Sequence, residues 1–134
     1  MKLHTEPLCH RFNSTNSVSL YVNNGIETSG NVVIGNDSGF TSGIAGSINR
    51  IALGTSAAQV DQGIASISIG RQAGQTSQGN NSVAMGNQAG NSNQSSNSVA
   101  IGETAARLDQ GEFSVAVGDS AGETSQGNEA VAIG

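Results

Sequence analysis

A four-residue apolar motif that ends in glycine recurs along the chain of 134 residues, and its spacing constrains the fold more than any other feature. Each copy has an aliphatic residue, a second residue that is usually small, another aliphatic residue and glycine. The glycines are 19 residues apart once and then 16 residues apart five times. Such a fixed period is typical of repeat proteins, in which each unit packs only on its neighbours. The seven copies are residues 32–35, 51–54, 67–70, 83–86, 99–102, 115–118 and 131–134.

Other columns of residues keep the same period. Three and four residues after each motif glycine there is a pair of small residues, such as Ala73-Gly74 and Ala89-Gly90. From the second copy on, glutamine always stands eight residues after the glycine, usually followed by another glycine. The glutamines are Gln62, Gln78, Gln94, Gln110 and Gln126.

The motif has the alternation of a short β-strand, with two apolar residues on one face. Glycine then ends the strand and permits a positive φ, and the Gln-Gly step is typical of a second corner. Sixteen residues that hold two short strands and two corners match one coil of a parallel β-solenoid. The sequence therefore predicts an all-β solenoid over residues 31–134, with 16-residue coils. Residues 1–30 are expected to form an N-terminal cap or attachment segment with one degenerate repeat.

The alternation also predicts which side chains lie inside. We expect the first and third residues of each motif to form the core of the coil and the second residue to point outward. The outward column is mostly alanine, which would make a flat face for a neighbouring chain; the alternative is a column of small, simply exposed residues. The predicted core residues are Val83, Met85, Val99, Ile101, Val115 and Val117, and the candidate face for a neighbouring chain is Ala52, Ala84, Ala100, Ala116 and Ala132.

Stacking of coils at about 4.8 Å places like residues over like. The five glutamines are then expected to form a ladder of side-chain amides, each donating to the next; the alternative is a row of exposed polar corners. Arg107 and Glu123 are expected to be cross-coil neighbours of opposite charge. Glu103 and Asp119 would be like-charged neighbours on a solvated acidic face, or less readily a weak cation site. The glycines that end the motif strands, Gly70, Gly86, Gly102 and Gly118, are expected to stack in the same way at the other corner of the coil.

Composition and motifs exclude several classes of function. The net charge is −5 and the five basic residues are scattered, which argues against a nucleic-acid partner. No apolar run approaches the ~18–20 residues of a membrane span. A single cysteine excludes an internal disulfide framework. No phosphate-binding loop or catalytic triad is expected, and we expect no cofactor and no enzymatic activity. His4, Glu6, Cys9 and His10 match no zinc signature and are expected to belong to an ordinary terminus rather than a metal site.

The run Ser98-Val99-Ala100-Ile101-Gly102, with relatives that begin at Ser82, Ser114 and Ala130, resembles the head repeats of YadA-like trimeric autotransporter adhesins. Similar repeats occur in phage tail fibres and in surface or fibre proteins of large viruses. The resemblance covers roughly residues 31–134. It implies a left-handed parallel β-roll, three chains side by side, and a surface-exposed adhesive or fibrous protein.

These observations together predict a non-enzymatic shaft or head of a trimeric surface fibre, a viral or phage fibre or an adhesin that takes part in attachment. Its expected location is a virion or cell surface, and its expected partners are two further copies of itself and a host receptor, matrix protein or glycan. The alternative is a spacer that carries a receptor-binding or autocatalytic chaperone domain outside this chain.

Overall fold

The computed structural model describes residues 32–38 and 49–134, and every regular element within them is a parallel β-strand of three residues. The strands form two sheets, and this arrangement confirms the predicted all-β solenoid with coils about 16 residues apart. The seven-stranded sheet contains β1 (Val32–Ile34), β2 (Ile51–Leu53), β4 (Ile67–Ile69), β6 (Val83–Met85), β8 (Val99–Ile101), β10 (Val115–Val117) and β11 (Val131–Ile133). The four-stranded sheet contains β3 (Val60–Gln62), β5 (Thr76–Gln78), β7 (Ser92–Gln94) and β9 (Leu108–Gln110).

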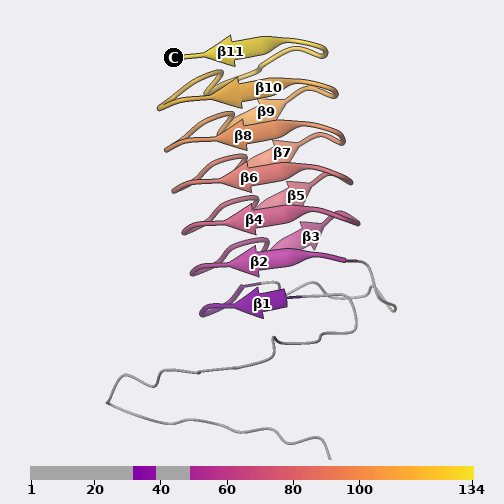
Figure 1. Ribbon diagram of the computed structural model, residues 1–134, viewed down its shortest axis with the longest axis vertical. Helices are drawn as coiled ribbons and strands as arrows, with labels where there is room; N and C mark the ends of the chain where they lie inside the picture. The colour runs from indigo at the N-terminus through magenta and orange to yellow at the C-terminus, as the bar shows by residue number, and fades with distance from the viewer. Residues whose placement is uncertain (1–31, 39–48) are drawn as a thin grey trace, which may run out of the picture.

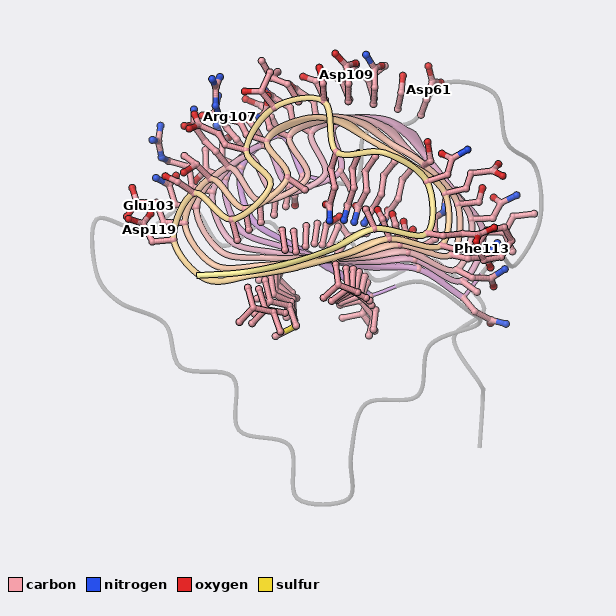
Figure 2. All side chains as sticks on the ribbon, turned by 90° about the horizontal axis from the view of Figure 1, so that it is seen from above. Asp61, Glu103, Arg107, Asp109, Phe113 and Asp119 are labelled. Atoms are coloured by element: carbon pink, nitrogen blue, oxygen red, sulfur yellow. The ribbon has the colours of Figure 1, made fainter. Side chains whose placement is uncertain are left out.

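The path of the chain gives the solenoid its hand. In Figure 1 the strands of the seven-stranded sheet run from right to left at the front, the four-stranded sheet lies behind them, and the coils rise toward the C-terminus. Figure 2, seen from above, shows the two sheets as the long sides of a flattened ring. A chain that rises while it crosses the front from right to left winds in the left-handed sense, which is the hand that the resemblance implies.

The register stacks equivalent residues directly over one another. Between β8 and β10, for example, Val99 pairs with Val115 and Ala100 with Ala116. The four-stranded sheet has the same register, because Gln62 pairs with Gln78 and Gln78 with Gln94. Each column in the sequence is therefore a straight row of side chains along the solenoid axis.

The motif glycines occupy corners that no other residue fits. Gly70, Gly86, Gly102 and Gly118 have φ between 122° and 133°. A Cβ on Gly102 would collide with the backbone carbonyl group of Gly118 in the next coil, and the same contact recurs at Gly35, Gly54, Gly70, Gly86 and Gly118. The glycine column is therefore set both by its positive φ and by the close approach of stacked backbones.

The direction of the side chains corrects the expected core. Ala52, Ala84, Ala100 and Ala116, expected on an outer trimer face, are fully buried inside the coil, and Ala132 packs partly buried against the same cluster. The predicted core residues lie instead on the outside of the seven-stranded sheet, where they are half-buried or exposed. These are Val83, Met85, Val99, Ile101, Val115 and Val117.

The width of the coil explains this reversal. The interior is so narrow that a single methyl group on Gly90 would come within 2.7 Å of the Gln94 Oε1 atom. A β-branched side chain from every strand would overfill this space. Alanine and serine fit it, so the small middle residue of the motif turns inward and the two large aliphatic residues turn outward.

The predicted N-terminal segment, residues 1–30, with its degenerate repeat, lies outside the described residues. So does most of the insertion that lengthens the first interval to 19 residues.

The glycine column yields a test of the stacking. We expect Gly102→Ala to lower the free energy of unfolding by about 3 kcal/mol or more, because the new methyl group collides with backbone and the φ of 129° is strained. Gly127→Ala is the matched control, since a Cβ there has no atom within 4 Å. Urea unfolding followed by far-UV circular dichroism measures both variants, and equal stability of the two would contradict the stacked geometry.

Candidate functional site

Two columns of aliphatic side chains cover the outer side of the seven-stranded sheet, and we call them the apolar face. The face consists of the first and third residues of each strand in that sheet. Figure 2 shows them as two rows of side chains that project away from the ring. The first-residue column is Val32, Ile51, Ile67, Val83, Val99, Val115 and Val131, and the third-residue column is Ile34, Leu53, Ile69, Met85, Ile101, Val117 and Ile133.

The side chains of the apolar face are half-buried or exposed along its whole length in the single chain. Met85 and Ile101, in the middle of the stack, are 37% and 38% exposed, and Ile133 in the last described coil is 78% exposed. The two columns contain no polar or charged residue. Contiguous apolar surface of this kind marks an interaction site rather than ordinary protein surface.

The glutamine column lies inside the coil and is not a row of exposed corners. Gln62, Gln78, Gln94 and Gln110 are only 1–2% exposed. Each Nε2 donates to the backbone carbonyl oxygen of the residue eleven positions earlier, at 2.8–3.1 Å. In the coils of β2, β4, β6 and β8 the side-chain amides therefore tie the four-stranded sheet to the seven-stranded sheet across the interior.

The expected amide ladder is present at two steps. The Nε2 atom of Gln78 donates to the Oε1 atom of Gln94 at 3.3 Å, and that of Gln110 donates to Gln126 at 3.3 Å. A column of buried serines accompanies the glutamines, and each hydroxyl donates to the carbonyl oxygen three residues earlier. These serines, Ser66, Ser82, Ser98 and Ser114, are visible in the sequence as a column, but their burial follows only from the small interior.

The charged columns lie on the outside of the coil. Arg107 Nε and Glu123 Oε1 are 3.0 Å apart, which confirms the predicted cross-coil ion pair. Their side chains are 34% and 40% exposed, so the pair contributes at most about 1 kcal/mol. Figure 2 places Glu103 and Asp119 together at one corner, where Glu103 accepts a hydrogen bond from the Asn87 Nδ2 atom at 3.1 Å. The described residues contain no group of three or more His, Cys, Asp or Glu side chains that could hold a metal ion.

Sequence reasoning missed an outer amide ladder in the column that ends with the ion pair. Gln75 Nε2 donates to Gln59 Oε1 at 3.0 Å, and Asn91 Nδ2 donates to Gln75 Oε1 at 3.1 Å. The signal was available, because amide residues in register at a period of 16 must stack once the coils do. The side chains of His4, Glu6, Cys9 and His10 lie outside the described residues.

Searches of protein-family models, curated proteins and solved structures give no match to this chain. The resemblance to YadA-like head repeats therefore depends on the repeat motif alone. Within the described residues, no helix has the length and apolar character that crossing a membrane requires.

A buried atom without a partner gives a test of the interior. Gln110 Oε1 is buried and has no hydrogen-bond donor, whereas the equivalent atom of Gln78 accepts from Ser68 Oγ at 2.7 Å. Ala100 stands ten residues before Gln110, as Ser68 does before Gln78. We expect Ala100→Ser to supply the missing donor and to raise the free energy of unfolding by about 1 kcal/mol.

Ala84→Ser is the control for this variant, because Gln94 Oε1 already accepts a hydrogen bond from Gln78. It should leave the stability nearly unchanged. The urea midpoints of the two variants decide the point, and a loss of stability in Ala100→Ser would mean that the interior geometry is wrong.

Proposed function

We propose that this chain is a non-enzymatic structural segment, a shaft or head, of a trimeric surface fibre in which three copies pack through their apolar faces. The observation that carries the proposal is the apolar face itself. It presents two unbroken columns of large aliphatic side chains on the outside of a coil whose own buried hydrophobic residues, among those described, are all alanines.

The small alanine core explains why association is needed. Burial of apolar surface is the main favourable term in folding, and alanine contributes little of it. The large aliphatic side chains, which would contribute most, remain accessible in the single chain. Packing them against another chain provides the apolar burial that the narrow interior cannot.

A further copy of this chain is the occupant that fits the apolar face best. The side chains recur once per coil, about 4.8 Å apart, over seven strands and roughly 29 Å. Another copy presents the same aliphatic columns at the same spacing, so that the contact can continue in register along the whole stack. A globular partner would match this period only over part of its length.

The number three comes from the resemblance to trimeric adhesin heads alone. Three flattened coils can turn their apolar faces toward a common axis and leave their four-stranded sheets outside. Figure 2 places Asp61, Asp109 and Arg107 on the side of the ring opposite the apolar face. The surface of such a trimer would therefore be polar and charged.

We propose further that the fibre stands on a virion or cell surface and takes part in attachment to a host receptor, matrix protein or glycan. Repeated corners on three chains allow weak contacts to add by multivalency. The alternative is a spacer that carries a receptor-binding or chaperone domain outside this chain. A binding screen of the assembled protein on glycans and matrix proteins separates the two: a bound ligand supports attachment, and none supports the spacer.

The assembly is tested by one charge placed on the apolar face. We expect the unmodified chain to sediment as a trimer of about 40 kDa, three times 13.4 kDa, and Ile101→Glu to abolish the trimer because the carboxylate would be buried without a partner. Val60→Glu is the matched control, since Val60 is 43% exposed on the four-stranded sheet and Ile101 is 38% exposed on the apolar face. Analytical ultracentrifugation measures the mass of each.

A trimer that persists in Ile101→Glu, or a monomeric unmodified chain, would overturn the proposed interface. Should Ile101→Glu also lose its β-sheet circular dichroism, the test is instead whether the Tm of the unmodified chain depends on its concentration. A chain that folds with its partners becomes more stable as its concentration rises, whereas the Tm of a monomer is constant.

A further inference from the structure

Arg50 interrupts the most regular polar column of the interior. It stands four residues before a motif glycine, the position that Ser66, Ser82, Ser98 and Ser114 hold in the coils above. Its side chain is nevertheless buried, with only 6% of its surface exposed. A long cationic side chain has therefore replaced a small hydroxyl at a position that faces the inside of the solenoid.

The Arg50 guanidinium group binds a carbonyl group that has a different donor in the coils above. Its Nη1 atom donates to the backbone oxygen of Gln62 at 2.8 Å, at the end of β3. The equivalent oxygen of Gln78 accepts from the backbone N–H of Gly63 in the coil below, at 2.7 Å, and Gln94 accepts from Gly79 in the same way. The same bond recurs at Gln110 and Gln126. In β3, the first described strand of the four-stranded sheet, Arg50 thus supplies the hydrogen-bond donor that a backbone N–H supplies in the coils above.

The space inside the stack shows why this substitution is confined to one place. Between regular coils the interior does not accept even a methyl group at Gly74, whose Cβ would lie 2.8 Å from the Gln78 Cδ atom. A guanidinium group has no room there. The guanidinium group of Arg50 instead lies at the end of β3, where its Nη1 atom donates to the carbonyl oxygen of Gln62.

Burial has an electrostatic cost that only a structural benefit can offset. Desolvation lowers the pKa of the Arg50 guanidinium, so that its charge is held in a less favourable environment than water. A planar group with several donors can bind backbone oxygens that would otherwise lose their hydrogen bonds, and leaving such an oxygen unbonded costs free energy. We propose that Arg50 caps β3, the first described strand of the four-stranded sheet, where it replaces the serine of the column and holds β3 against β2.

This proposal concerns the single coil and does not depend on how many chains associate. The proposal predicts that Arg50→Ser destabilises the coil, whereas the repeat pattern predicts that the same substitution stabilises it. Replacing an irregular residue by the residue that the other copies share normally stabilises a protein. If Arg50 is a cap, Arg50→Ser must instead loosen the coil, although it makes the column regular.

The test is hydrogen exchange on the full chain with Arg50→Ser. We expect the amides of Ile51, Val60 and Gly63 to exchange at least ten-fold faster, and those of Val99 and Val115 to keep their rates. Arg71→Ser is the control, because it removes an exposed arginine from the outside of the same region and should change none of these rates. Unchanged or slower exchange at β2 and β3 in Arg50→Ser would overturn the cap.

A second variant decides the matter if Arg50→Ser fails to fold. Arg50→Met keeps most of the side-chain volume and removes every donor. Faster exchange confined to β2 and β3 in this variant supports the hydrogen-bonding cap, and wild-type exchange rates there contradict it.

Discussion

The narrow interior of the coil is the constraint on which the rest of the structure depends. Two short strands face each other across a space whose buried side chains, among the described residues, are alanine, serine and glutamine, with Arg50 as the exception. Because stacking repeats the same contact in every coil, no large aliphatic side chain has room inside in any of them. The aliphatic residues that the strands require must therefore lie outside, and they create the apolar face.

The glutamine column shows how a polar group can serve as the core of a small coil. Each side-chain amide spans the interior and donates to the backbone of the opposite sheet. Such bonds are directional, so they fix the distance between the sheets more sharply than alanine contacts alone. The interior thus provides geometry and hydrogen bonding, and the large apolar surface is left available for another chain.

The period of the sequence was enough to predict the strands of the seven-stranded sheet, the glycine corners, the stacking and the ion pair of Arg107 with Glu123. It did not place the strands of the four-stranded sheet, which end on the glutamines. It could not decide which face of the strand is inside, because alternation defines two faces without naming the buried one. The better signal was the character of the middle column, where Ser68 and the alanines are uniformly small while the flanking columns vary freely among Val, Ile, Leu and Met. A uniformly small column indicates a confined space, whereas large residues of varying shape indicate a surface that can adapt. For Arg50 the sequence shows only a break in the serine column, and its inferred capping role depends on a contact between residues twelve positions apart that the period does not reveal.

The central claim is that neighbouring residues of one strand serve opposite purposes, Ala100 inside the coil and Ile101 toward another chain. Cysteine cross-linking tests it most directly, in a Cys9→Ser background that removes the one native thiol. Mild oxidation should join chains of the Ile101→Cys variant into covalent dimers, whereas the thiol of Ala100→Cys should remain uncross-linked and unreactive to maleimide until the protein is unfolded. Cross-linking or labelling at Ala100 in the native protein, with none at Ile101, would contradict the account.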